Sequence, residues 1–173
     1  MGVRIVFTAS NFPLSRLIRW ATRGRVSHAM ILYDDPLWGG EWVAEATIGG
    51  VKKLPAEKAM HNVYAVFECK FDAHPALQAI RNHIGDGYDY AGMAWAGWAI
   101  LLWRLFRQKV RRPWRKSSEE FCSALIALFL WAAVKLGSIE RPSGLLTEAS
   151  SNYPERILKV LEKDPAAFER CTI

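Results

Sequence analysis

The stretch EEFCSALIALFLW, residues 119–131, is where the fold is decided, because apolar residues continue almost without a break from Phe121 to Val134. A run of this length suits a helix better than a strand, so we expect a buried helix over about residues 118–135. Cys122 falls in its first turns. There the backbone N–H groups and the positive end of the helix dipole favour a thiolate, which makes Cys122 a candidate nucleophile.

A second interpretation of Cys122 is inert packing, because free cysteines are among the most buried residue types. Two carboxylates, Glu119 and Glu120, stand beside it in the sequence, and like charge would raise the pKa of the thiol. Neighbouring residues alone therefore leave both interpretations open.

Length and composition predict one globular domain over residues 1–173, since 51% of the residues are apolar and 23% charged. Three cysteines without a secretion signal argue against a disulfide framework and for a cytoplasmic location. No Cys/His spacing fits a metal, so we expect neither metal nor cofactor.

Strands and helices follow from hydrophobic periodicity and turn residues. We expect strands over residues 3–7, 26–33, 41–47, 51–54 and 62–70, and helices over 14–22, 74–84, 118–135 and 154–163. Gly24 is expected to end the first helix and Gly137 the apolar one, and the C-terminus is expected to fray. Antiparallel strands grouped in the first 70 residues predict an α+β fold, with an antiparallel sheet packed against the helix that carries the cysteine.

A cysteine nucleophile needs a base and a group that orients the base. His28 lies in an expected strand among apolar residues, where a histidine can also be a semi-buried structural residue. Glu45 lies on the next strand between two alanines, and a buried carboxylate needs a partner such as a histidine across the hairpin. Glu41 is the rival carboxylate, but it lies nearer the turn and is expected in solvent.

Five short motifs in a fixed order carry a resemblance to a known family: SHAMILY (27–33), Glu45-Ala46, Gly50-Val51, Tyr88-Asp89 and FCS (121–123). Together they resemble the circularly permuted branch of the NlpC/P60 papain-like superfamily, which includes YiiX-like and lecithin:retinol acyltransferase-like proteins. In that branch the histidine strand precedes the cysteine helix. The resemblance covers about residues 24–145 and implies a permuted papain-like fold.

The resemblance implies that Cys122 is the nucleophile, His28 the general base and Glu45 the third polar residue. Tyr88 matches a family tyrosine that precedes the cysteine, and its hydroxyl could donate a hydrogen bond to the oxyanion. The other interpretation of Tyr88 is a turn tyrosine packed on the core.

An apolar and basic insertion over about residues 91–116 departs from the family. Seven basic and no acidic residues lie between Arg104 and Lys116, which leaves 16 basic against 17 acidic residues in the rest of the chain. This segment could be an interfacial helix on an anionic membrane or a buried helix followed by a solvated basic loop. One short basic cluster with Trp114 is weak support for nucleic-acid binding, which we do not expect.

The sequence therefore predicts a thiol hydrolase, cysteine peptidase or acyltransferase that acts on an amide or ester bond. A peptide, a peptidoglycan fragment and a lipid-like molecule are all compatible substrates. The alternative is a membrane-surface or partner-binding module with an idle papain-like site, peripheral to a membrane through residues 91–116.

Overall fold

The computed structural model describes residues 2–47, 49–86, 122–145 and 153–171. Within these residues, six strands form one sheet in the order β4-β3-β2-β1-β5-β6, and every neighbouring pair is antiparallel. The strands are β1 (Arg4–Thr8), β2 (His28–Asp34), β3 (Glu41–Thr47), β4 (Gly50–Pro55), β5 (Val63–Cys69) and β6 (Phe168–Cys171). The predicted α+β class with an antiparallel sheet is confirmed.

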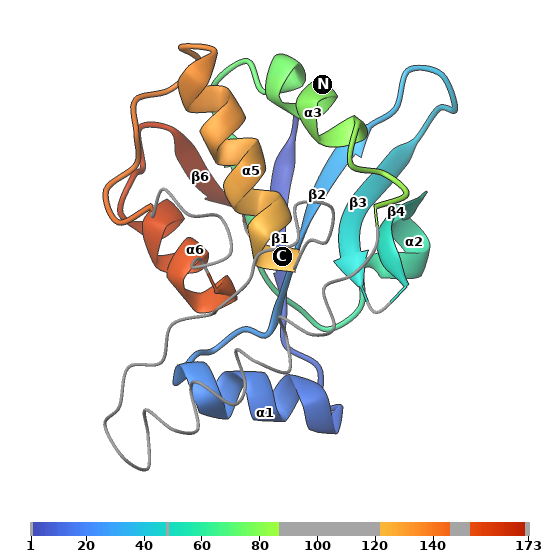
Figure 1. Ribbon diagram of the computed structural model, residues 1–173, viewed down its shortest axis with the longest axis vertical. Helices are drawn as coiled ribbons and strands as arrows, with labels where there is room; N and C mark the ends of the chain where they lie inside the picture. The colour runs from blue at the N-terminus through green and yellow to red at the C-terminus, as the bar shows by residue number, and fades with distance from the viewer. Residues whose placement is uncertain (1, 48, 87–121, 146–152, 172–173) are drawn as a thin grey trace.

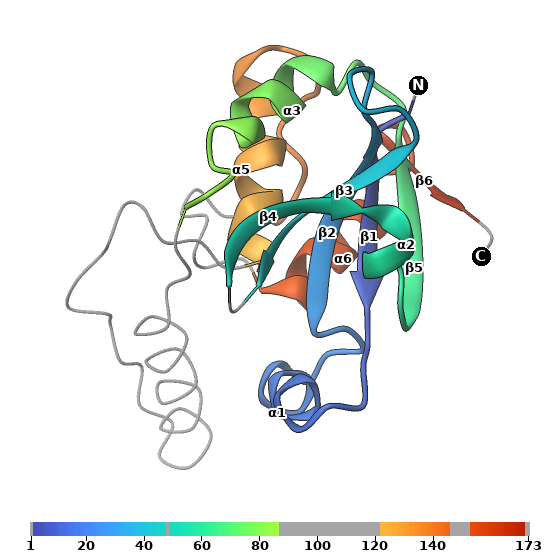
Figure 2. The same ribbon diagram turned by 90° about the vertical axis from the view of Figure 1, so that its right-hand side faces the viewer.

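Helices cover both faces of this sheet. They are α1 (Pro13–Thr22), α2 (Ala56–Ala59), α3 (His74–Arg81), α5 (Cys122–Lys135) and α6 (Pro154–Glu162). Figures 1 and 2 show α3, α5 and α6 on one face and the short α2 on the other. The first helix, α1, stands apart beyond the end of the sheet where β1 ends and β2 begins. In the part of the chain described here, no helix is both long and apolar enough to cross a membrane.

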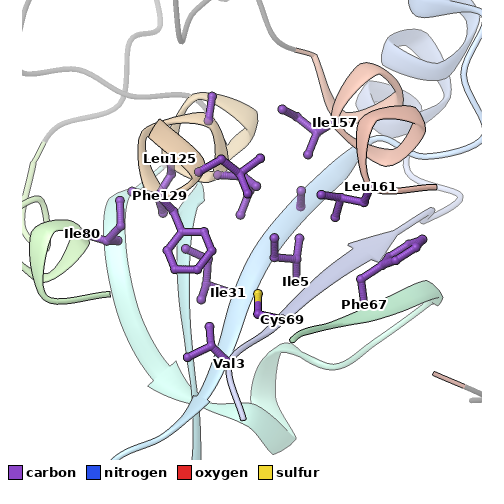
Figure 3. Packing of buried hydrophobic residues seen from close by; sticks show 14 of the residues in the cluster. Val3, Ile5, Ile31, Phe67, Cys69, Ile80, Leu125, Phe129, Ile157 and Leu161 are labelled. Atoms are coloured by element: carbon purple, nitrogen blue, oxygen red, sulfur yellow. The ribbon is translucent and has the colours of Figure 1, made fainter. Parts of the chain in front are cut away.

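The central helix, α5, packs against the sheet and against α3. Leu125, Ile126, Phe129 and Leu130 have no exposed surface, as expected of a helix that is apolar all round. Figure 3 shows Leu125 and Phe129 of this helix facing the sheet side chains. The predicted end at Gly137 is confirmed by its φ of 73°, a left-handed conformation that glycine adopts without strain.

The first helix ends differently from the prediction. Arg23, and not Gly24, adopts the left-handed conformation, with φ of 51°. The N–H groups of Arg23 and Gly24 donate to the carbonyls of Trp20 and Arg19, which closes the last turn. Gly24 is needed for space instead, because a Cβ there would lie 2.7 Å from the Cβ of Glu155.

The expected fraying of the C-terminus is wrong for the described residues, because Phe168–Cys171 form β6 beside β5. Phe168 is 2% exposed and anchors this short strand in the core. Helix α3 also ends earlier than predicted, at Arg81, so Ile84 lies outside it and is 37% exposed. The four-residue α2 was not predicted, because one helical turn has no hydrophobic period to detect.

Candidate active site

The histidine is placed at the beginning of a central strand. β2 starts at His28 rather than at the predicted Val26, and His28 pairs with Thr8 of β1. The residue before it is held firmly: the N–H of Ser27 donates to the Thr8 carbonyl at 3.0 Å, and its hydroxyl lies 2.5 Å from that of Ser15 in α1. These bonds position the backbone that carries the imidazole.

The carboxylate of Glu45 contacts this imidazole. Its Oε2 lies 2.9 Å from Nε2 of His28, and the two side chains are 15% and 25% exposed. The register pairs Ile31 with Ala44, so the contact runs diagonally across the β2–β3 hairpin rather than between directly opposed residues. The predicted partnership of these two residues across the hairpin is therefore present.

The rival carboxylate lies elsewhere, as expected. Glu41 stands at the turn end of β3, opposite Asp34, and its side chain is 46% exposed. It forms an ion pair with Arg4 of β1. Glu41 therefore forms a surface ion pair and does not contact the imidazole.

The thiol of Cys122 meets the same histidine from the other side. Cys122 is the first residue of α5 as the structure describes it and is only 8% exposed. The imidazole of His28 and the backbone N–H groups of Ala29 and Ser123 face this side chain closely enough to stabilise a negative charge on the sulfur. Because Nε2 of His28 is held by Glu45, Nδ1 is the nitrogen left for the thiol.

The charges of the three groups support one another. Burial opposes a charge on His28, but the Cys122 thiolate and then the Glu45 carboxylate outweigh it and raise the pKa of His28 from 6.5 to about 10. Burial likewise opposes the thiolate, but the imidazolium and the two backbone N–H groups outweigh it and lower the pKa of Cys122 below its ordinary 9.0. At neutral pH the arrangement therefore favours a thiolate–imidazolium pair.

The second buried cysteine has the opposite environment. Cys69 is 7% exposed in β5, and burial, with a smaller contribution from Glu68, raises its pKa to about 12. Such a thiol is protonated and unreactive at neutral pH, which fits a role in core packing. Cys171, in β6, is half-buried, and its sulfur faces the Glu169 carbonyl at 3.8 Å.

Two predictions lie outside the described residues: the oxyanion role of Tyr88 and the insertion over about residues 91–116. The start of the cysteine helix before Cys122, including Glu119 and Glu120, also lies outside them. In the ranges that the structure covers, no three His, Cys, Asp or Glu side chains are grouped as metal ligands.

Sequence reasoning missed two contributions to the site. The N–H of Ala29 stabilises the sulfur, and the Ser15–Ser27 contact links α1 to the residue before His28. Ser27 belongs to the motif that carried the resemblance, but nothing in the sequence names its partner twelve residues earlier. A backbone donor such as Ala29 has no sequence signal, because every residue except proline has an N–H group.

Comparison of the sequence with protein families and curated proteins identifies no relative. No protein-family model and no curated protein matches the chain. Any functional conclusion therefore depends on the arrangement of Cys122, His28 and Glu45 themselves.

Proposed function

We propose that this protein is a thiol-dependent hydrolase or acyltransferase that cleaves an amide or ester bond. The observation that carries the proposal is the contact of the Cys122 thiol with His28, whose other ring nitrogen lies 2.9 Å from Glu45. Covalent acyl transfer requires a nucleophile that contacts a base and a carboxylate that orients the base. The opposite pKa shifts of the thiol and the imidazole prepare the nucleophile in its charged form.

In the proposed reaction, the Cys122 thiolate attacks the carbonyl carbon and forms a C–S bond. The tetrahedral intermediate then collapses, and the leaving amine or alcohol takes a proton from Nδ1 of His28. Water, or an acceptor hydroxyl or amine, then attacks the thioester and gives a proton to His28. The C–S bond breaks, the acyl group leaves on the acceptor, and the thiolate–imidazolium pair is restored. Glu45 holds the ring and its tautomer throughout.

The fold that we propose is the circularly permuted papain-like fold of the NlpC/P60 superfamily. Two observations support it: an antiparallel sheet packs against the helix that begins with Cys122, and the strand that begins with His28 precedes that helix in the chain. A peptide, a peptidoglycan fragment and a lipid-like molecule remain the proposed substrate classes. Tyr88 remains a proposed oxyanion donor.

An acylation experiment tests the proposal without the natural substrate. We expect the protein to react with p-nitrophenyl acetate in a burst of one equivalent of nitrophenolate, leaving one acetyl group on the chain. Peptide mapping by mass spectrometry should place that acetyl group on Cys122 and leave Cys69 and Cys171 unmodified. The variant Cys122→Ala should show no burst.

If the site is idle and the protein is a binding module, the outcome differs. No burst would appear. The cysteines would be acetylated slowly and in order of their solvent exposure, with Cys171 modified before the buried Cys122. Acetylation of Cys171 at a rate equal to that of Cys122 would overturn the proposed chemistry.

A further inference from the structure

The first helix leaves much of its apolar side at the surface, unlike an ordinary amphipathic helix. Its apolar side chains lie at the surface: Phe12, just before it, is 74% exposed, Leu17 is 55% exposed and Leu14 is 38% exposed. Within α1 the buried side chain is that of the polar Ser15. An amphipathic helix of a globular protein normally buries its apolar stripe, so this apolar face requires another explanation.

Polar contacts hold α1 in this orientation. The hydroxyl of Ser15 donates to the Ser10 carbonyl at 2.7 Å and lies 2.5 Å from that of Ser27. The guanidinium of Arg19 donates to the same Ser10 carbonyl at 3.1 Å. These hydrogen bonds, of which the Ser15–Ser27 contact is buried, specify the orientation of the helix, because turning the apolar stripe inward would leave them unmade. The apolar face is therefore held outward.

Exposed arginines flank this apolar surface. Residues 2–33 contain five arginines and no acidic residue, and Arg4 and Arg25 form ion pairs with glutamates from later in the chain. Arg16 and Arg23 are exposed and form no ion pair with any residue that the structure describes. A surface hollow of about 470 Å³ at the C-terminal end of the helix is lined by Arg16, Arg19, Trp20, Arg23, Gly24 and Arg25. Apolar side chains thus lie directly beside a group of guanidinium ions.

We propose that α1, with Phe12 before it and the arginine hollow after it, docks on an anionic phospholipid bilayer. Helices lie in a membrane interface when an apolar face enters the acyl boundary while Arg and Lys contact anionic headgroups. The hollow presents the guanidinium groups of Arg16 and Arg23 to a lipid phosphate, which guanidinium binds through paired hydrogen bonds.

Charge argues against the other occupants of this face. A second copy of the chain would bring the same arginines against each other. A nucleic acid would neutralise the arginines but would leave Phe12 and Leu17 without an apolar partner.

The docking surface lies at the catalytic end of the molecule. Figures 1 and 2 show α1 beyond the end of the sheet where β2 begins, and α5 begins at the end nearer α1. His28 starts β2, and the Ser15–Ser27 contact joins the helix to the residue before it. Docking through α1 would therefore bring the candidate site near the bilayer surface. The proposal does not depend on the chemistry of Cys122 and can be tested separately.

Sedimentation with vesicles tests the docking surface on the full chain. We expect binding to vesicles of phosphatidylcholine mixed with phosphatidylserine at low salt, with much weaker binding at high salt or to phosphatidylcholine alone. Leu17→Glu should weaken binding at least about ten-fold, because it places a charge in the apolar face. Arg16→Gln should weaken it about five-fold, the effect of one basic residue near an anionic surface.

Matched controls use exposed residues of the same types on other elements. Leu37→Glu changes a leucine that is 84% exposed in the β2–β3 turn, and Lys58→Gln removes an exposed cation from α2. Both variants should bind vesicles as the wild type does, and circular dichroism should show that all four variants are folded.

Three results would overturn the proposal. The first is an absence of vesicle binding at low salt. The second is wild-type binding by Leu17→Glu, which would place the membrane contact on another part of the chain. The third is binding to a DNA duplex that competes with the vesicles and survives Leu17→Glu, which would identify the arginine surface as a nucleic-acid site.

Discussion

Replacing Glu45 with glutamine gives the sharpest test of the electrostatics of the site. Glutamine has nearly the same shape and can still accept a hydrogen bond from Nε2 of His28, but it carries no charge. The geometry is therefore preserved, and only the electrostatic stabilisation of the imidazolium is removed. We expect the pKa of His28, raised to about 10 in the wild type, to fall.

The expected size of this fall follows from the contact. The two side chains are 25% and 15% exposed and their atoms are 2.9 Å apart, so solvent screens the contact only in part. A hydrogen bond to a charged group contributes about 1.5–3 kcal/mol and a neutral one about 0.5–1.5 kcal/mol. The difference of about 1–1.5 kcal/mol corresponds to about one pKa unit. The Cys122 thiolate should keep the remaining pKa above 6.5.

Titration followed by NMR of the imidazole nitrogens measures this shift. The chain has four histidines, and the signal of His28 can be assigned by its loss in His28→Gln. The matched control is Glu41→Gln, which removes a carboxylate from the same strand but not from the site. An unchanged midpoint in Glu45→Gln, or an equal fall in Glu41→Gln, would refute the proposed role of Glu45.

Four further predictions concern reactivity and stability. The rate of Cys122 alkylation by iodoacetamide should fall only when pH drops through the lowered pKa of the thiol. In His28→Ala the midpoint of this pH profile should move above 9.0, because burial then opposes the thiolate and no imidazolium stabilises it. Hydrolysis should also decline on the alkaline side near pH 10, where His28 loses its proton. Phe129→Ala should lower the free energy of unfolding in urea by about 3–5 kcal/mol, because it empties a fully buried site. Glu155→Ala should lower it by about 2 kcal/mol, because the carboxylate is 3% exposed and accepts from both the N–H and the guanidinium of Arg25.

The stability predictions can also fail in a defined way. An unfolding free energy of Phe129→Ala within about 1 kcal/mol of the wild type would contradict the central position of α5 in the core. For the alkylation experiment, a His28→Ala variant that reacts with the wild-type pH profile would show that the imidazole does not stabilise the thiolate.

The helices and strands that agree with the sequence are those with a strong local pattern. The apolar run that ends near Lys135 has no polar face, so burial of most of the helix was the only favourable outcome. The hairpin of β2 and β3 was visible because glycines and Pro36 separate two apolar segments. Local signals failed for β6 and α2, since four residues are too few for a hydrophobic period.

The sequence by itself determined the residues with the right chemistry and the elements that carry them: a cysteine at the start of an apolar helix, a histidine and a glutamate on adjacent strands. Only the tertiary structure decided between a thiolate and an inert thiol at Cys122. In the sequence the helix start favoured the thiolate and the neighbouring glutamates opposed it, and in the structure a distant imidazole lowers the pKa of the thiol. The tertiary structure also decided that α1 buries Ser15 and leaves Leu14 and Leu17 at the surface. Both outcomes arise between segments far apart in the chain, where electrostatic interactions and hydrogen bonds depend on distance in space rather than on separation in sequence.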